Sequence, residues 1–291
     1  MCKAAYNPFN DVARIGPWSF APRIPEEPRG QAMAQVVDYE QVIREVADEI
    51  EAMNLPIAAP PSWERLEKGG PVTRPLDLAS FIEHTALKPE TTTADVAQLC
   101  AQANRFGFRA VCVNPVFVAE AKGRLAGTKC AVVSVVGFPL GANLKETKVR
   151  ETQSVIEQGA DEVDMVCWIG ALKGHDYRAV YEDVGAVVAG ARPHPVKVIL
   201  ETALLEPAEK VAACMLSVRA GAAFVKTSTG FGGRGATVED VELMRRVVGH
   251  GIGIKAAGGI RDYGFARALI HAGANRLGCS ASVAIVTGSP G

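Results

Sequence analysis

The stretch AAFVKTSTGFGGRGATVEDVELMRRVVGHGIGIKAAGGIRD (residues 222–262) contains the pattern that decides the fold. Two short apolar runs, at 223–226 and 252–255, each end in a lysine and lead into a glycine-rich turn. The segment between them, 238–248, has a helical pattern. A strand, a helix and a second strand in this order form a βαβ unit, whose strands lie parallel. The stretch therefore predicts two neighbouring parallel strands with Lys226 and Lys255 at their carboxyl ends.

The same alternation of apolar runs and helical patterns extends over residues 76–291. Strands are predicted at 80–84, 110–114, 131–136, 162–167, 196–201, 223–226, 252–255 and 275–278. Helical patterns fall at 94–105, 145–158, 173–190, 207–219, 238–248 and 262–271. Most strands are apolar at consecutive positions, as expected of parallel strands that are covered on both faces.

Eight strands that alternate with helices over about 215 residues predict an α/β fold of the (β/α)8 TIM barrel type. A doubly wound open sheet is the alternative fold. The glycine fingerprint GxGxxG at the opening of the first helix, typical of dinucleotide-binding sheets, is absent, and so is a P-loop.

The chain divides near residue 75 into an N-terminal extension, 1–75, and a barrel domain, 76–291. Segment 1–37 is rich in turn residues and has no period. An amphipathic helix is predicted over 38–53, and we expect it to pack on the barrel or on another subunit. Its apolar stripe consists of Tyr39, Val42, Ile43, Val46, Ile50 and Met53. We expect deletion of residues 1–75 to keep the active-site chemistry while lowering stability or altering assembly.

Composition narrows the class of protein. A formal net charge of −1 gives no field that would attract nucleic acid or an anionic membrane. No run of 18 apolar residues predicts a membrane span, and the first 30 residues lack the apolar segment of a secretory signal. The seven cysteines are scattered without CxxC or zinc spacing. We therefore expect a cytoplasmic protein with reduced thiols, and no metal or cofactor.

Polar residues stand where several predicted strands end. In a (β/α)8 barrel the chemistry lies at the carboxyl ends of the strands. The residues in question are Glu83, His84 and Thr85 on strand one, Asn114 on strand two, Asp164 on strand four, and Glu201 and Thr202 on strand five. The sequence therefore predicts a polar site at this end of the barrel.

The two strand-end lysines are the strongest candidates for catalysis. One such lysine alone is explained by a side chain that reaches water or pairs with a carboxylate. Two ammonium groups ~5 Å apart, however, repel by roughly 3 kcal/mol at an effective dielectric constant of about 20. This repulsion, together with burial, lowers the pKa of one amine towards neutrality. Such an amine is a nucleophile that forms a Schiff base with a carbonyl compound.

Asp164 and Glu162 share one face of their strand, and a carboxylate inside a barrel needs a cation or hydrogen-bond donors. Either catalytic lysine meets this need, so Asp164 is a structural ion pair or a functional group. Lys197 begins strand five and is interpreted as a buried structural pair at the amino end. His84 is interpreted as a hydrogen-bonded wall residue rather than a catalyst.

Three glycine- and serine-rich loops follow strands six, seven and eight, at 228–233, 256–262 and 278–282. Backbone N–H groups in such loops, with a helix beginning near Ser280, form an anion cradle. Phosphate sites in these barrels commonly follow strands seven and eight. Beside two lysines, the loops predict a phosphate-bearing carbonyl compound as the ligand. Arg261 either adds charge at the rim or pairs with Asp262.

The strand-end motifs resemble deoxyribose-phosphate aldolase, a class I aldolase family of the (β/α)8 type. The matching stretches follow in family order over about 76–287. They are FIEHTALKPETT (81–92), AVCVNP (110–115), VVGFPLGA (135–142), GADEVDMV (159–166), VKVILETALL (196–205), AGAAFVKTSTGF (220–231), IKAAGGIRD (254–262) and RLGCSAS (276–282).

The resemblance implies reversible cleavage of 2-deoxy-D-ribose 5-phosphate to acetaldehyde and D-glyceraldehyde 3-phosphate, without metal. It implies Lys226 as the Schiff-base lysine, Lys255 as the lysine that lowers its pKa, and Asp164 as the proton-transfer carboxylate. The implied phosphate-binding residues are Gly230, Gly258, Gly259, Gly278 and Ser280. The candidates for a proton relay or a cavity wall are Glu83, Thr85, Asn114 and Thr229. It also implies a homo-oligomer, a dimer or a tetramer.

Three residues depart from the family pattern. Glu83 stands where many members have Asp, Ala281 replaces a frequent Ser beside the phosphate, and Trp168 occupies a position often filled by Asn. Two other functions stay open at this point. One is a non-catalytic sugar-phosphate binding protein that kept the barrel, and the other is a related lyase or transaldolase on the same fold.

Overall fold

The structure is a computed structural model that describes residues 37–58 and 72–288. All of these except Val37 belong to one compact unit, Asp38–Gly291. The predicted irregular segment 1–37 therefore lies outside the described residues, apart from Val37. The boundary predicted near residue 75 stays a prediction, because residues 59–71 also lie outside them.

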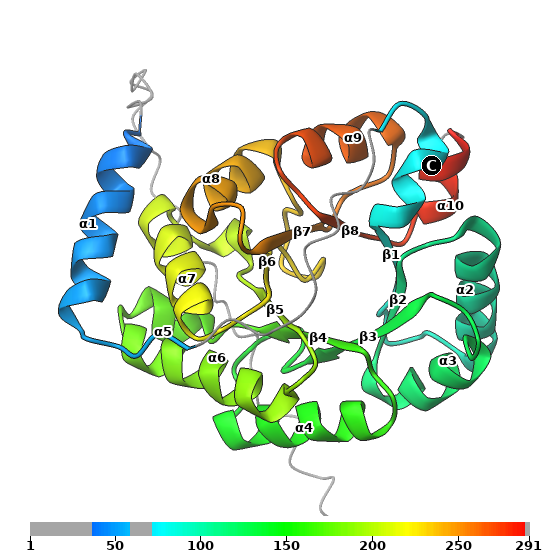
Figure 1. Ribbon diagram of the computed structural model, residues 1–291, viewed down its shortest axis with the longest axis horizontal. Coiled ribbons are helices and arrows are strands. Elements are labelled where there is room, and N and C mark those ends of the chain that lie inside the picture. Colours follow the sequence, from blue (N-terminus) through cyan, green and yellow to red (C-terminus); the bar gives the residue numbers. More distant parts are fainter. Residues whose placement is uncertain (1–36, 59–71, 289–291) are drawn as a thin grey trace, which may run out of the picture. The chain divides into compact units, whose positions relative to one another are not determined.

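Eight parallel strands close into a barrel in chain order, with β1 paired to β8. The strands are β1 (Ile82–Ala86), β2 (Ala110–Val113), β3 (Ala131–Val136), β4 (Glu162–Val166), β5 (Val196–Ile199), β6 (Phe224–Lys226), β7 (Gly253–Ala257) and β8 (Arg276–Cys279). The prediction of a (β/α)8 barrel is confirmed, and the open-sheet alternative is wrong. Figure 1 shows the strands at the centre with helices around them.

Helices surround the strands and cover their outer face. They are α2 (Thr93–Phe106), α3 (Val118–Arg124), α4 (Lys145–Glu157), α5 (Ile169–Lys173), α6 (Tyr177–Ala191), α7 (Pro207–Arg219), α8 (Val238–Val248), α9 (Tyr263–His271) and α10 (Ser282–Thr287). Short 3₁₀ turns are η2 (Pro75–Phe81), η3 (Pro115–Phe117) and η4 (Thr202–Leu204). Side-chain caps begin several helices where the sequence offers Asp or Thr, as Thr237 does for α8 by accepting from Asp240 N–H.

Two predicted boundaries were wrong. Strand one was predicted at 80–84 but runs from Ile82, because Pro75 opens the 3₁₀ turn η2 that extends to Phe81. Glu83 is therefore near the start of β1, inside the barrel, and not at the strand end. The helix predicted at 173–190 corresponds to α6, which begins only at Tyr177, because His175, with a positive φ of 57°, separates it from the short helix α5.

The register of neighbouring strands places the polar side chains in pairs. Lys226 of β6 lies directly opposite Lys255 of β7, and Asp164 of β4 lies opposite Lys197 of β5. Side chains alternate between the two faces of a strand, so these residues all enter the barrel interior. The barrel interior is consequently charged in its middle layers, whereas the helices pack on a shell of Val, Ile, Leu and Ala.

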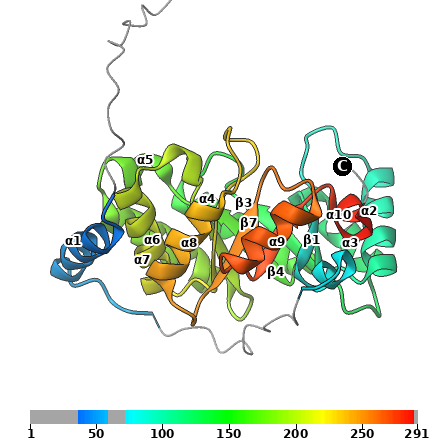
Figure 2. The ribbon, with the colours of Figure 1, turned by 90° about the horizontal axis from the view of Figure 1, so that it is seen from above.

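The N-terminal helix α1 (Tyr39–Ala52) confirms the helix predicted over 38–53. Its stripe buries Val46 and Ile50, and α1 lies against the outer side of α7 (Figures 1 and 2). Arg219 at the end of α7 donates to Leu55 O at 2.7 Å and pairs with Glu51. The stripe is therefore covered by the barrel unit of the same chain.

The described part of the chain adds two observations on thiols and membranes. Its six cysteines are free, and five of them are buried. Among its helices, none is long and apolar enough to cross a membrane.

Candidate active site

Lys226, Lys255 and Asp164 meet inside the barrel. The ammonium nitrogens of Lys226 and Lys255 donate to the same atom, Oδ2 of Asp164, at 2.8 and 2.7 Å. The two nitrogens therefore lie no farther apart than the sum of these lengths. Lys226 is 2% exposed, and Asp164 and Lys255 are fully buried. The sequence predicted this meeting, and the register of β6 and β7 explains it.

Further charged side chains extend the group into what we call the ion cluster, whose members are joined by ion pairs within 4 Å. Lys197 binds Asp164 Oδ1 at 2.9 Å and Glu162 Oε2 at 2.6 Å. Glu83 accepts from Lys255 and lies 3.5 Å from Lys197. The ion cluster consists of Glu83, Glu162, Asp164, Lys197, Lys226, Lys255 and Arg276.

Lys197 contributes more directly to the site than the sequence suggested. It is a buried ion-paired residue, as expected, but one of its partners is Asp164 itself. Because Lys197 occupies Oδ1, the other oxygen of Asp164 is left for Lys226 and Lys255 together. The carboxylate is thus fixed from three sides, which holds its orientation.

Burial and charge separate the pKa values of the two catalytic lysines. Burial, with the Lys255 ammonium as a further cause, lowers the pKa of Lys226, although Asp164 acts in the opposite direction. Burial also disfavours the charge on Lys255, but Asp164 and Glu83 outweigh it and hold the pKa of Lys255 well above its ordinary value. Repulsion and burial were both predicted to lower this pKa, and burial is the larger of the two causes.

The pKa of Asp164 depends on the lysines around it. Burial alone would raise the pKa of Asp164, but Lys197, Lys226 and Lys255 outweigh it and hold that pKa well below 3.8. The ion cluster has four basic and three acidic members. It is therefore neutral when one lysine is uncharged, and Lys226 is the member whose pKa is lowered. The pKa values of Lys197 and Lys255 are raised and those of Glu162 and Asp164 are lowered, so these four groups stay charged.

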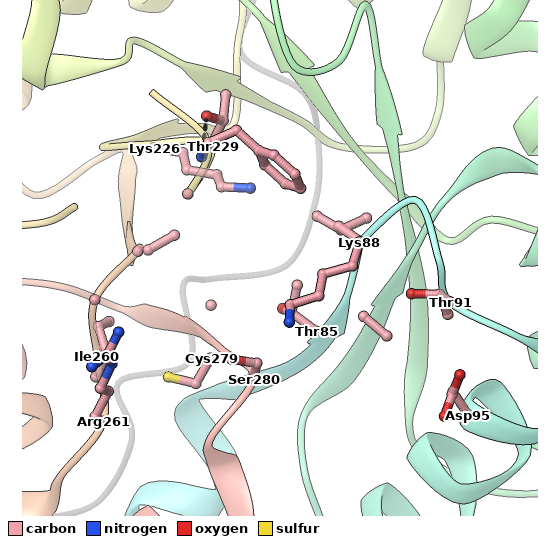
Figure 3. A pocket seen from close by; sticks show the side chains of 18 of the residues that line it. Thr85, Lys88, Thr91, Asp95, Lys226, Thr229, Ile260, Arg261, Cys279 and Ser280 are labelled. Atoms are coloured by element: carbon pink, nitrogen blue, oxygen red, sulfur yellow. Dashed lines mark hydrogen bonds between the residues drawn. The ribbon is translucent and has the colours of Figure 1, made fainter. Parts of the chain in front are cut away.

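A cavity of about 610 Å³ opens above Lys226 at the carboxyl ends of the strands. Its walls come from the loops after β1, β6, β7 and β8. Figure 3 shows the amines of Lys226 and Lys88 directed into it from opposite walls, with Arg261 and Ser280 along a third side. Lys226 is the member of the ion cluster that lines the cavity, so the amine with the lowered pKa is the one that a ligand meets.

Four of the five predicted phosphate-binding positions lie on these loops. Gly230, Gly258, Gly259 and Ser280 line the cavity between β6 and β8. The loops after β6 and β7 touch backbone to backbone, since a Cβ added at Gly235 would lie 2.1 Å from Gly258 O. Gly258 also has a φ of +87°, a conformation that glycine adopts without strain. Two loops therefore form one continuous wall.

Gly278 also lines the cavity, but the structure adds a second reason for a glycine there. It belongs to strand β8 and not to the loop that follows. A Cβ at this position would lie 3.0 Å from Cε of Lys255. The absence of a side chain makes room for the Lys255 stem, so this glycine touches the lysine pair directly.

Of the other predicted residues, some line the cavity and some do not. Thr85 lines the cavity and donates its hydroxyl to Glu83 O at 2.9 Å. Thr229 also lines it, but both its N–H and its hydroxyl point to Glu201 Oε2. Asn114 holds the loop after β1 by donating to Leu87 O at 3.2 Å, and it is not among the residues that line the cavity. His84 binds Gln102 at 2.8 Å, as expected of a wall residue.

The two remaining departures follow strands β4 and β8. Trp168 is 43% exposed at the start of α5, just after β4. Ala281 stands at the N-cap of α10, where its side chain makes no capping hydrogen bond. Ala281 therefore supplies no side-chain donor to this end of the cavity.

Sequence reasoning missed several lining residues and one supporting residue. Lys88, Glu90, Thr91 and Asp95 form the wall on the β1 side. The motif HTALKPETT (84–92) contains the first three and Asp95 follows it by three residues, so the end of the motif beyond the strand was the available signal. Glu201 was noted only as a strand-end residue, and nothing in the sequence shows that its side chain turns towards the loop after β6.

A closed (β/α)8 barrel with a buried lysine pair and a carboxylate below an open cavity places the protein among barrel enzymes whose site lies at the carboxyl ends of the strands. The model of the DeoC/LacD family of aldolases matches residues 76–285. The chain belongs to this family of aldolases, which are carbon–carbon lyases.

Individual relatives agree with the family model. The chain is 55% identical over 218 residues to the deoxyribose-phosphate aldolase of Thermococcus gammatolerans, across 74% of this chain and 97% of that one. It is 52% identical over 214 residues to the enzyme of that name from Caldanaerobacter subterraneus, across 72% and 93%.

Solved structures show the same relationship. A putative deoxyribose-phosphate aldolase from Coccidioides immitis has a TM-score of 0.74 at 37% identity, and the match covers 86% of this chain and 97% of that one. The deoxyribose phosphate aldolase from Aeropyrum pernix, described as a unique tetrameric structure, has a TM-score of 0.70 at 32% identity, over 85% and 96%.

Proposed function

We propose that the protein is a class I aldolase that reversibly cleaves 2-deoxy-D-ribose 5-phosphate to acetaldehyde and D-glyceraldehyde 3-phosphate. One observation carries the proposal: the amine of lowered pKa, on Lys226, faces the cavity, while its charged partners Lys255 and Asp164 lie beneath it. Relatives more than half identical to this chain carry the name of this activity.

The Lys226 amine attacks C1, the aldehyde carbon of the open-chain sugar, and loss of water leaves an imine. A protonated imine withdraws electrons, so it lowers the barrier to breaking the C2–C3 bond. The C3 hydroxyl loses its proton, the C2–C3 electron pair moves to form an enamine, and glyceraldehyde 3-phosphate leaves. Protonation of the enamine at C2 and hydrolysis of the imine then release acetaldehyde and return the free amine.

Asp164 and Lys255 are the proposed groups for these proton transfers, together with water. Asp164 Oδ2 is 2.8 Å from the Lys226 nitrogen, within the reach required of an acid–base partner. Lys255 keeps its proton, because its pKa is held high, and it is the adjacent donor to the same oxygen. Glu83 contacts Lys255 and is placed to support it, whereas Thr85 and Asn114 fit wall and loop-holding roles.

The loops after β6, β7 and β8 are the proposed phosphate site. Gly230, Gly258, Gly259, Gly278 and Ser280 line the side of the cavity where Arg261 also lies. Backbone N–H groups and a cationic rim favour a phosphate dianion. With C1 on Lys226, a phosphate bound there orients the sugar along the cavity.

The decisive experiment traps the imine. The protein is incubated with 2-deoxyribose 5-phosphate and sodium borohydride, and the peptide that contains Lys226 is analysed by mass spectrometry. We expect an adduct on Lys226, and retro-aldol activity that persists in chelator. Lys226→Ala loses both, whereas Lys145→Ala, a control on the outer face of the barrel at the start of α4, loses neither. Activity in Lys226→Ala without any adduct on the wild type contradicts the proposal.

We further propose that the enzyme is a cytoplasmic homo-oligomer. The solved relative from Aeropyrum pernix is described as tetrameric, which supports assembly of this chain. Sedimentation of the purified protein measures the number of subunits directly, and a sedimentation coefficient of a monomer at micromolar concentration contradicts it.

A further inference from the structure

Glu201 combines two features that lower stability, which indicates a functional role. It follows β5 with φ 56° and ψ 61°, a left-handed conformation that is unfavourable for a residue with a side chain. Its side chain is buried, with the residue 2% exposed, and Oε1 has no hydrogen-bond partner among the described residues. A buried polar atom without a partner also costs free energy. Such local costs are expected at functional sites.

The backbone around Glu201 explains how the conformation is held. Leu200 N–H donates to Lys226 O at 2.9 Å, and Thr202 N–H donates to Thr227 O at 3.0 Å. Both neighbours of Glu201 are thus hydrogen-bonded to the backbone of Lys226 and Thr227, at the end of β6. The left-handed residue between them places its side chain beside the loop after β6, which we define as residues 228–233.

The carboxylate of Glu201 holds this loop at two points. Oε2 accepts from the N–H of Thr229 at 3.2 Å and from its hydroxyl. The hydroxyl oxygen of Thr229 in turn accepts from Phe231 N–H at 3.0 Å. On the other side, a Cβ added at Gly232 would lie 2.6 Å from Cδ of Glu201, so the loop closes directly over the carboxylate.

The loop that Glu201 holds is a wall of the cavity. Thr229, Gly230 and Phe231 line it, and Lys226 lies just before the loop. Gly230 also lies close to Gly258 of the loop after β7, because a Cβ added at Gly258 would be 3.6 Å from Gly230 Cα. A shift of the loop would therefore move the surface proposed to meet the phosphate.

We propose that Glu201 is a positioning residue that fixes residues 228–233 against the phosphate-bearing end of the substrate. The inference rests on the proposed function for the nature of that substrate. Thr229 acts as the link: with both of its donors engaged by the carboxylate, its backbone is locked and Gly230 is held at the cavity surface. Glu201 touches neither the imine carbon nor the proton-transfer groups in this role.

The test compares Glu201→Gln with the wild type on two substrates, 2-deoxyribose 5-phosphate and 2-deoxyribose. Gln keeps the size of the side chain but removes the charge that holds two donors. We expect KM for the phosphorylated sugar to rise about tenfold with kcat within about twofold, a loss of uniform binding. We expect kcat/KM for 2-deoxyribose to change less than about twofold.

Two further variants separate positioning from general stability. In Gly232→Ala the added methyl group pushes on the carboxylate of Glu201 from the opposite side. We therefore expect the same rise in KM for the phosphorylated sugar, and this variant supplies the test if Glu201→Gln folds poorly. Glu209→Gln is the matched control, a buried carboxylate on α7 that binds Lys173 and does not line the cavity. It should lower Tm without changing the ratio of kcat/KM between the two sugars.

The outcomes distinguish this proposal from the proposed function. Trapping of acetaldehyde on Lys226 with borohydride tests imine formation alone, and we expect it to be equal in the wild type and Glu201→Gln. If the wild type forms no adduct, the proposed function fails. If the adduct forms but Glu201→Gln and Gly232→Ala affect both sugars equally, or affect neither, then Glu201 is a structural carboxylate and the proposal is overturned.

Discussion

Lys226 and Lys255 lie opposite each other in the register of β6 and β7 and donate to the same oxygen atom of Asp164. The two lysines are chemically identical but lie in different surroundings. Lys255 touches a second carboxylate, that of Glu83, and is sealed below the cavity, whereas Lys226 has one carboxylate and faces the cavity. This asymmetry decides which amine loses its proton.

Removing the charge of Lys255 should move the pH profile of the enzyme. In Lys255→Met the ammonium that lowers the pKa of Lys226 is lost, and Oδ2 of Asp164 no longer shares its charge between two lysines. Both effects raise the pKa of Lys226. Each unit of rise lowers the fraction of free amine at neutral pH about tenfold. We expect the acid limb of kcat/KM to shift to higher pH by at least about one unit.

The measurement is kcat/KM as a function of pH for the wild type and Lys255→Met. The surface variant Lys145→Met, which leaves the barrel interior untouched, serves as the control and should keep the wild-type profile. A variant whose activity is lower by the same factor at every pH would show that Lys255 acts on proton transfer alone, and not on the pKa of Lys226.

Asp164→Asn should weaken both the fold and the reaction. The amide keeps the size of the carboxyl group but leaves three buried cations with one fewer counter-charge. Breaking a buried ion pair costs about 3–5 kcal/mol of stability. Loss of the acid–base group should lower kcat at least about 100-fold.

The pH dependence of the Asp164→Asn stability loss has a definite sign. The pKa of Asp164 is below its ordinary value of 3.8, so the stabilisation is complete above that value and is lost as the pH falls through the lower, folded-state pKa. Urea unfolding of both proteins should therefore give a constant difference in free energy from pH 7 to about pH 5. The difference should shrink below about pH 4, and a constant difference down to pH 3 would argue against this account.

The strands and the lysine pair could be predicted because each depends on a local pattern. Apolar runs bounded by glycines place β6 and β7, and a lysine at the end of each run enters the site once the barrel closes. The partners of Lys197 could not be predicted in the same way. They depend on the stagger between β4 and β5, which places Lys197 beside Asp164 and not at the amino end alone.

The direction of two carboxylate side chains also could not be predicted from the sequence. Glu201 reaches the loop after β6 only because its backbone is left-handed, and a glutamate gives no sign of that conformation. Glu83 was predicted at the end of strand one but lies near the start of β1, because η2 delays the start of that strand. In both cases the local backbone conformation decided where a carboxylate points.

Gly278→Ala should disturb catalysis without replacing a catalytic residue. The added methyl group would lie 3.0 Å from Cε of Lys255 and 3.0 Å from Cβ of Ala257, so the lysine stem must shift. Displacement of a positioned group by a fraction of an ångström or more lowers kcat by roughly 10- to 100-fold. Kinetics on the phosphorylated and unphosphorylated sugars should show the same factor, because the effect is on Lys255.

A glycine on a helix provides the control for this variant. Gly185 lies in α6, and a Cβ added there meets no atom within 4 Å. Gly185→Ala should leave kcat unchanged and stabilise the protein by about 1 kcal/mol or less. If Gly278→Ala instead raises KM for the phosphorylated sugar alone, the glycine serves the phosphate and not the lysine.

The helix α1 should contribute to stability and not to the chemistry. It covers α7 on the outer face of the barrel, and Ala58 N–H also donates to Arg219 O at 2.9 Å. Removal of residues 1–71 exposes the surface that Val46 and Ile50 cover and keeps Thr73 and Arg74, whose N–H groups bind Asp77 at the start of η2. We expect a stability loss of about 3 kcal/mol or more, since each fully buried aliphatic side chain contributes roughly 1.5–3 kcal/mol.

The melting temperature measures the predicted loss of stability, and the borohydride adduct measures whether the chemistry at Lys226 is kept. Each kcal/mol lowers Tm by roughly 2–4 °C in a protein of this size. Val46→Asp in the full chain should give a smaller loss in the same direction, because one buried position is made polar while the helix remains. A truncated protein with unchanged Tm would mean that α1 packs without stabilising the barrel. Loss of the adduct on Lys226 would mean that the helix reaches the chemistry through α7.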